Sequence, residues 1–208
     1  SNVDLTLALK NGLMELNPFN FIVPGGTVKS DIAIDTRPVV VRTEYDVRLS
    51  PTRLGTLLAR FGTEKSGTTG TVSGRMQMVG FGDSVRESFA TSNGRVAFVL
   101  PQGTFWTRNI QLAELDIGTF VHKMFQDKLK KPVEINCGVI AFTVRGGTAA
   151  ADPILIDTKK NVMLGRGGFS FRSEAIDMAV RADGKTFSLF SGQSPVGVGG
   201  YFAGAEND

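Results

Sequence analysis

Few residues in this chain of 208 could perform catalysis, since His122 is the sole histidine and Cys137 the sole cysteine. A Ser-His-Asp triad would need His122, which lies beside Lys123 on the water-facing side of a predicted helix. Cys137 occupies an apolar position of a predicted strand, which favours a small buried side chain over a reactive thiol. One histidine and one cysteine cannot assemble most zinc sites.

Two glycine-rich segments, 165–168 (Gly-Arg-Gly-Gly) and 197–200 (Gly-Val-Gly-Gly), look like phosphate loops only superficially. Neither carries the lysine and hydroxyl residue of a P-loop, so bulges or turns are the better interpretation. Asp31 and Asp35 share one side of a predicted strand and could hold a cation, but solvated surface charges explain them better. We therefore predict no enzyme, no catalytic residue, no metal site and no cofactor, with a hydrolase that uses His122 as a distant alternative.

The composition is that of a folded protein rich in turns, with 25 glycines and 41% hydrophobic residues. The formal net charge of +3 comes from interspersed acidic and basic residues, which argues against a nucleic-acid partner. No apolar run approaches the ~18 residues of a membrane helix, and no signal-peptide pattern is present. The chain begins with Ser1 rather than methionine, from which we expect a processed or excised piece of a longer protein.

Apolar residues alternate with polar ones through most of the chain, which predicts antiparallel strands with one apolar and one wet face. The longest such run extends from Val133 to Arg181, with shifts of the alternation at Gly138 and at residues 165–168 that indicate bulges. The most regular strand is predicted from Val39 to Leu49. The Asn11-Gly12 pair predicts a first hairpin.

Three helices are expected between these strands. One should begin at Ser50-Pro51 with Ser50 as N-cap, a second follows the capping box of Ser84 and Glu87, and a longer one spans residues 110–129. Residues 1–62 would form an N-terminal meander with a helix, and residues 63–208 a C-terminal sheet with two helices, joined as one continuous sheet.

The predicted helices are too few to cover the predicted sheet. A helix about 10 Å wide covers roughly two strands that lie ~4.8 Å apart, so three helices cover about six of ten to twelve strands. The uncovered apolar surface must find a partner. The sheet could curl on itself into a dry sandwich, pair with another copy, or hold an apolar ligand.

The order and spacing of the glycine motifs resemble the C-terminal region of the AsmA family over Gly26 to Phe202. No single motif is diagnostic, and the resemblance depends on the order in which the motifs follow one another and on the distances between them. The motifs are Gly70-x3-Gly74, Gly80-x-Gly82-x-Ser84, Asn93-Gly94, Leu115-Asp116-Ile117-Gly118, the Cys137 strand, Ile156-Asp157-Thr158, Gly165-Arg166-Gly167, and Ser194-Pro195-Val196 with Gly200.

With this resemblance, the predicted fold is mainly β (α+β), a long curved antiparallel β-meander with about three helices packed on part of its apolar face. The resemblance implies a periplasmic module of the diderm envelope, anchored in the inner membrane by a helix outside this chain, with roles in outer-membrane assembly and lipid homeostasis. An apolar β-groove would bind or shield phospholipid or lipopolysaccharide acyl chains, and the candidate groove residues are Val28, Ile32, Ile34, Val39, Val41, Tyr45, Val47, Phe169 and Phe171. The alternative is a non-catalytic structural module that contacts envelope assembly proteins.

Overall fold

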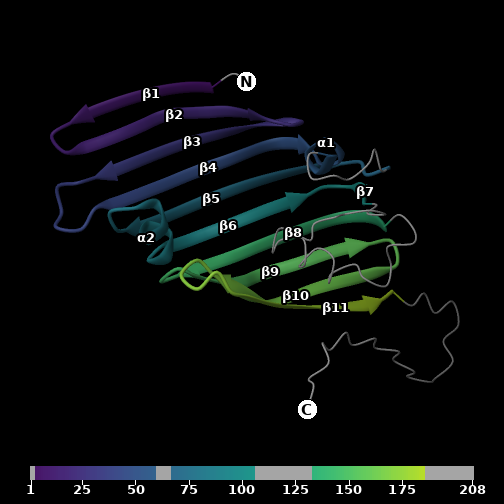
Figure 1. The fold of residues 1–208 in the computed structure, drawn as a ribbon. Helices are drawn as coiled ribbons and strands as arrows, with labels where there is room; N and C mark the ends of the chain where they lie inside the picture. The colour runs from purple at the N-terminus through teal and green to yellow at the C-terminus, as the bar shows by residue number, and fades with distance from the viewer. Residues whose placement is uncertain (1–2, 60–66, 106–132, 186–208) are drawn as a thin grey trace, which may run out of the picture.

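The computed structural model describes residues 3–59, 67–105 and 133–185, which form one antiparallel sheet of 11 strands (Figure 1). Strand accounts for 71% of this part of the chain, which confirms the mainly β prediction. The strands are β1 (Val3–Lys10), β2 (Leu13–Val23), β3 (Gly26–Asp35), β4 (Arg42–Arg53), β5 (Thr71–Phe81), β6 (Asn93–Leu100), β7 (Gly103–Phe105), β8 (Val133–Arg145), β9 (Thr148–Thr158), β10 (Asn161–Ser170) and β11 (Ile176–Gly184).

The sheet is a meander in which each strand pairs with its neighbour in the sequence. The one interruption is β7, which pairs with the start of β8, so that β6 and β8 are neighbours in the sheet. Strands β4 and β5 pair across the boundary predicted near residue 62, so both sides of that boundary share one sheet. The division into two parts stays a prediction.

Two short helices, α1 (Leu54–Ala59) and α2 (Val85–Ala90), occur in the described residues, where about three helices were expected. The third predicted helix, at 110–129, lies outside these residues. Helix α2 begins where the capping box predicted, because Ser84 Oγ accepts a hydrogen bond from the Glu87 N–H at 3.2 Å.

The predicted start of the first helix was wrong. Ser50 lies within β4, where its hydroxyl both accepts from the Thr27 N–H and donates to the Thr27 carbonyl, at 2.9 Å each. This side chain joins β4 to β3 beside an irregularity of the β4–β5 pairing, and the helix begins only at Leu54. At its other end β4 begins at Arg42 rather than at Val39.

Strict alternation gives the sheet one apolar face. A single row of directly paired residues crosses ten strands, and each member is apolar or glycine: Leu7, Leu16, Ile32, Tyr45, Met78, Gly94, Val144, Ala149, Phe169 and Ile176. The next row toward the other strand end is Leu5, Phe19, Ser30, Val47, Met76, Val96 and Phe142. Because side chains alternate along a strand, charged residues such as Asp31, Asp46 and Arg95 lie on the opposite face.

The sheet curls around its apolar face. Phe89 of α2 stacks on Tyr45 of β4 at 5.0 Å between ring centroids, and Phe171 at the end of β10 contacts Phe89 at 5.2 Å. The rings of Tyr45 and Phe171 therefore lie within about 10 Å of each other, although in a flat sheet five strand spacings would separate β4 from β10 by about 24 Å. The apolar face is the concave one.

Two clusters of buried side chains form the core on this face, in its C-terminal half. The first contains Met78, Phe142, Val144, Ala149 and Ile154. The second contains Phe105, Ile135, Ile156 and Met163, with Leu54 and Leu58 of α1 packed against it. Helices α1 and α2 thus lie over opposite ends of the same strands (Figure 1).

A glycine allows α2 to approach the sheet. A methyl group on Gly80 of β5 would lie 2.0 Å from the Ser88 carbonyl oxygen, so no other residue fits without moving the helix. On the other side of the helix end, a methyl group on Gly147 would lie 2.2 Å from the Ala90 carbonyl oxygen. The absence of a side chain at both glycines therefore lets α2 lie close against the apolar face.

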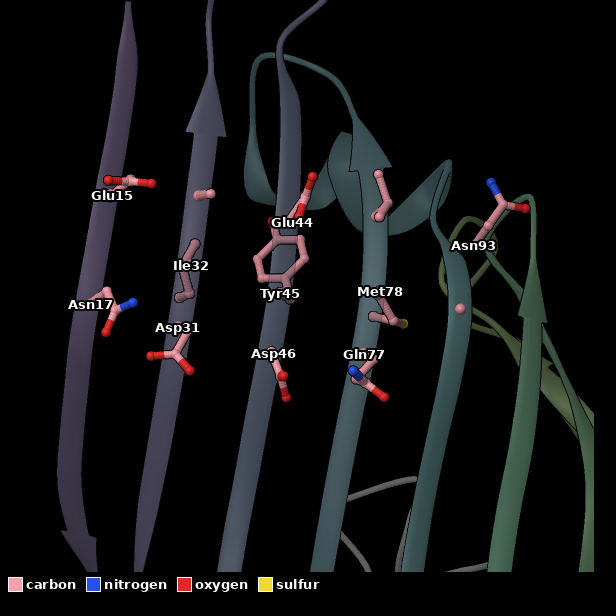
Figure 2. A pocket seen from close by; sticks show the side chains of 13 residues that line it. Glu15, Asn17, Asp31, Ile32, Glu44, Tyr45, Asp46, Gln77, Met78 and Asn93 are labelled. Atoms are coloured by element: carbon pink, nitrogen blue, oxygen red, sulfur yellow. The ribbon is translucent and has the colours of Figure 1, made fainter. Parts of the chain in front are cut away.

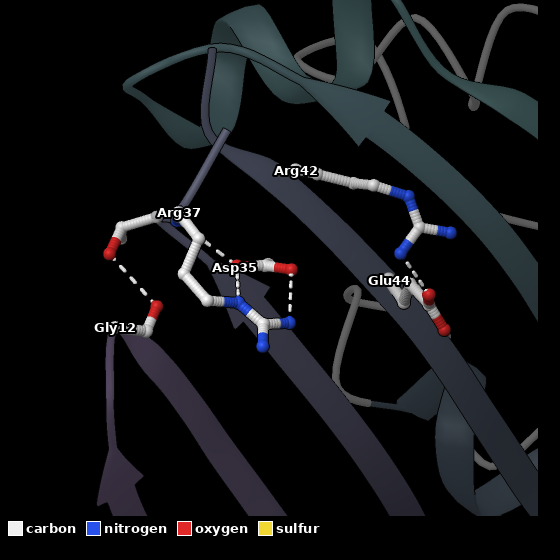
Figure 3. A network of polar contacts seen from close by, with 6 residues as sticks. Gly12, Asp35, Arg37, Arg42 and Glu44 are labelled. Carbon is white, nitrogen blue, oxygen red and sulfur yellow. Dashed lines mark hydrogen bonds and ion pairs between the residues drawn. The ribbon is translucent and has the colours of Figure 1, made fainter. Parts of the chain in front are cut away.

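The turn of the first hairpin is tied to the connection between β3 and β4 (Figure 3). Asn11 and Gly12 adopt φ values of 49° and 78°, as the predicted two-residue turn requires. The Gly12 carbonyl accepts hydrogen bonds from the N–H and the hydroxyl of Thr36, at 2.9 and 2.8 Å. Asp35 accepts two side-chain hydrogen bonds from Arg37, at 2.8 and 2.7 Å, which lower the pKa of Asp35 to about 2. These bonds fix the ends of β2 and β3.

Candidate functional site

The candidate site is the open part of the concave apolar face, over β1 to β4. Four of the nine predicted groove residues line it as half-buried side chains: Val28, Ile32, Ile34 and Val47. Helices α1 and α2 pack against the two core clusters at opposite strand ends, and the N-terminal strands extend beyond them (Figure 1). Along the first row described above, the exposed fraction of the residues rises from 1% at Val144 to 56% at Leu7.

Tyr45, Phe169 and Phe171, also predicted as groove residues, belong to an aromatic cluster that closes one end of the concave face. Phe169 contacts Phe171 edge-on at 5.1 Å and Phe142 at 5.2 Å, so the rings connect β4, α2, β10 and β8. The Tyr45 hydroxyl also donates a hydrogen bond to Ser88 Oγ at 3.1 Å. These residues bound the open surface and hold its curvature, since they join strands that are distant in the sheet.

Val39 and Val41 lie before β4, in its connection with β3, and are not on the strand that the alternation predicted. Val39 is fully exposed. The alternation continues through this segment, but the backbone turns before Arg42, so the apolar pattern alone placed the start of the strand too early.

The sequence-based list omitted the apolar residues of β1 and β2. Strand β1 extends the apolar face outward from β2. Its four apolar residues pair directly with apolar residues of β2: Val3 with Phe21, Leu5 with Phe19, Leu7 with Leu16, and Leu9 with Met14. The signal was present in the sequence, because both segments alternate and the Asn11-Gly12 turn sets their register.

Cys137 was predicted to be buried and is exposed. The irregularity in the β8–β9 pairing falls at Asn136, between Ile135 and Cys137, two positions before the predicted bulge at Gly138. Ile135 and Gly138 are both buried, and Cys137 therefore faces the polar side. The second predicted bulge is confirmed, because the β9–β10 register shifts between Gly165 and Gly168.

The polar face carries a network of ion pairs centred on Asp46. Its carboxylate lies 2.8 Å from Nη2 of Arg75 on the next strand and 2.7 Å from Nη2 of Arg48 on the same strand. The hydrogen bond from Arg75, followed by that from Arg48, outweighs the effect of partial burial and lowers the pKa of Asp46 to about 2. Asp46 is therefore ionised at neutral pH.

A hollow of about 390 Å³ lies beside this network on the polar face (Figure 2). The polar side chains around it are Glu15, Asn17, Asp31, Glu44, Asp46, Gln77 and Asn93. Among the described residues, no group of three His, Cys, Asp or Glu side chains is arranged to hold a metal ion. His122, on which the hydrolase alternative depends, lies outside the described residues. The hollow is open and of mixed character, because apolar and aromatic residues also line it: Ile32, Ala33, Tyr45, Met78 and Val79.

These observations define a class of protein: an open antiparallel sheet that curls around its apolar face and carries its charges outside. Neither helix of the described part has the length and apolarity needed to span a bilayer. The sequence profile of the AsmA family matches residues 1–152. Because this match covers well over half of the chain, the protein belongs to the AsmA family, as the glycine motifs suggested.

A relative with a curated description is the AsmA family protein YhjG of Escherichia coli (strain K12), which is 24% identical over 203 residues. The alignment covers 97% of this chain and 29% of that relative, so the chain spans less than a third of the relative's length. No solved structure matches the chain. Membership of the AsmA family supports a function connected with the cell envelope.

Proposed function

We propose that the open apolar face of β1 to β4 binds or shields lipid acyl chains, as a non-catalytic part of a protein that serves outer-membrane assembly and lipid homeostasis in the periplasm. The full-length protein would be anchored to the inner membrane by a segment outside this chain. The observation that carries the proposal is the uneven burial of one continuous apolar face, which forms a packed core over β5, β8, β9 and β10 and is open over the N-terminal strands.

The open surface is suited to an acyl chain because it is apolar, concave and bounded. Transfer of each CH₂ group from water stabilises the bound chain by ~0.8 kcal/mol, so eight methylenes contribute about 6 kcal/mol before the entropic costs of binding. The aromatic cluster at Phe89 and Phe171 closes one end, whereas Ile32 and Val47 lie in the open part. Headgroups would stay in water at the edge of the sheet, since the open face offers few charges to hold them.

A titration with a fluorescent fatty acid tests the proposal on two variants of β3. Ile32→Gln places an amide on the apolar face, and Lys29→Gln places the same amide on the polar face, three residues away. We expect Ile32→Gln to weaken binding about tenfold and Lys29→Gln to leave it within twofold, because only the first change removes buried apolar contacts. Equal affinities for the two variants, or no binding by the unaltered chain, would contradict the proposal.

The second candidate function is a structural module that acts through protein contacts. The exposed strand β1 at the sheet edge favours it, because an edge strand can pair with a strand of another chain. Light scattering on the protein with and without bound fatty acid separates the two functions. A protein that stays monomeric and takes up fatty acid stoichiometrically contradicts the structural-module function.

A further inference from the structure

A buried hydroxyl lies on the open part of the concave apolar face. Ser30 of β3 belongs to the second of the two rows described above, in which it pairs with Phe19 of β2 and Val47 of β4. It is the polar member of that row, and only 3% of the residue is exposed. Its side-chain oxygen forms no hydrogen bond with any residue that the structure describes. An unpaired donor and acceptor therefore lies within an apolar surface.

Other buried hydroxyls in the described part of the chain are hydrogen-bonded, as buried polar groups usually are. Three of them donate to backbone carbonyl groups at 2.7 or 2.8 Å: Thr52, Ser92 and Thr158. An unpaired buried hydroxyl lowers stability, and alanine would occupy the same place without that cost. The contrast indicates that the Ser30 hydroxyl serves binding rather than folding.

Thr43 of β4 is also buried, at 5% exposed, and its hydroxyl likewise forms no hydrogen bond with a described residue. Its surroundings differ from those of Ser30. Thr43 pairs with Gly80, against which α2 packs, so it lies at the end of the strands that this helix approaches. Ser30 lies instead among side chains of β2, β3 and β4 that are only half-buried. A ligand on the open face would therefore meet Ser30 rather than Thr43.

The surroundings of Ser30 define the kind of group that its hydroxyl can bind. A carboxylate or phosphate would lose its hydration there without compensation, because the neighbouring cations Lys29 and Arg48 lie on the opposite face of the sheet. An ester carbonyl is neutral, accepts a hydrogen bond, and is already joined to an apolar acyl chain. It therefore matches a single hydroxyl on an apolar surface.

We propose that the Ser30 hydroxyl donates a hydrogen bond to the ester carbonyl of a bound acyl chain, while the headgroup of the lipid stays in water. The open face then prefers ester-linked lipids to lipids of the same length without the carbonyl. This inference rests on the proposed function, because it names the class of lipid that the same face binds. One neutral hydrogen bond corresponds to about a fivefold difference in affinity.

A matched pair of lipids tests the inference. One is a phosphatidylcholine with two ester-linked octanoyl chains, and the other is its analogue with two ether-linked octyl chains, which differs only in the carbonyl groups. Titration calorimetry measures both affinities for the unaltered chain, for Ser30→Ala and for the control Thr43→Val. We expect the unaltered chain and Thr43→Val to bind the ester about fivefold more tightly than the ether, and Ser30→Ala to bind both equally.

Urea unfolding without lipid shows whether Ser30→Ala acts through the fold. Its midpoint should equal or exceed that of the unaltered chain, because alanine removes an unpaired hydroxyl, and a lower midpoint would overturn the inference. Equal affinities of the unaltered chain for the two lipids, or an ester preference that survives in Ser30→Ala, would also overturn it and leave the proposed function standing. If the unaltered chain binds neither lipid, the proposed function itself fails, and this inference fails with it.

Discussion

A methyl group added at Gly74 tests the packing of the concave face most sharply. Gly74 of β5 is paired with Phe98 of β6, and both face the apolar side. The ring of Phe98 lies over the glycine, since a methyl group there would be 2.6 Å from Phe98 Cδ1 and 2.8 Å from Cε1. Gly74→Ala should therefore displace the ring and lower the free energy of unfolding by about 1–3 kcal/mol, the usual range for overpacking.

Removal of the ring should abolish this penalty. Phe98→Ala alone should cost about 2 kcal/mol, less than the ~3–5 kcal/mol of a fully buried phenylalanine, because Phe98 is half-buried. In the double variant the methyl group added at Gly74 would have the Ala97 carbonyl oxygen as its nearest remaining contact, at 3.3 Å. The two substitutions should thus be non-additive by about 1–2 kcal/mol, with the double variant close to Phe98→Ala alone.

Urea denaturation of the four proteins at one concentration measures this coupling. Gly138→Ala serves as the control, because a methyl group on this strand glycine would meet its neighbours no closer than 3.5 Å, and the change should stay within about 0.5 kcal/mol. Additive effects of Gly74→Ala and Phe98→Ala would refute the inference that the ring covers the glycine on the apolar face.

Three further changes test other parts of the structure. Asp46→Asn should lower the free energy of unfolding by about 1 kcal/mol at neutral pH, a value reduced for solvent screening. Because the folded-state pKa of Asp46 is depressed from 3.8 to about 2, this contribution is present above pH 3.8 and is lost as the pH falls toward 2. An unchanged difference between the two proteins at pH 2 would contradict the ion-pair account. In urea unfolding, Phe89→Ala should cost about 2–3 kcal/mol, because it removes the ring that joins β4 to β10. Tyr45→Phe should cost about 1 kcal/mol, because it removes only a hydroxyl. Equal losses would argue against the ring contact. Ile154→Ala should cost about 2–5 kcal/mol and Ile176→Ala under 1 kcal/mol in thermal or urea unfolding, as their 2% and 41% exposures imply. Similar values would contradict the difference in burial between the core and the sheet edge.

Local signals in the sequence predicted most of the strands. The alternation from Val133 to Arg181, the Asn11-Gly12 turn and the capping box at Ser84 each depend on residues within a few positions of one another, and the structure confirms them. The start of β4 and the start of α1 were placed too early. At Ser50 the hydroxyl bonds to the backbone of Thr27, 23 residues away, and this long-range contact overrides the local capping signal.

The shape of the candidate site could be predicted only in part. The sequence showed that one face of the sheet is apolar and larger than the helices can cover, and half-buried Ile32 and Val47 lie on that face. The alternation alone did not show that the face is concave; only the family resemblance implied a curved sheet with a groove, and the contact between Phe89 and Phe171 joins residues that are far apart in the chain. Cys137 shows the same limit: because the bulge lies at Asn136, two residues earlier than predicted, Cys137 faces the polar side instead of the apolar side.

The central claim is that acyl chains contact the apolar face of the N-terminal strands. A photo-reactive amino acid at Ile32 or at its neighbour Asp31 tests this directly, because adjacent residues of β3 face opposite sides of the sheet. After irradiation of cells and mass spectrometry of the purified protein, we expect lipid adducts at position 32 and none above background at position 31. Adducts at both positions in equal amounts, or at neither, would contradict the account.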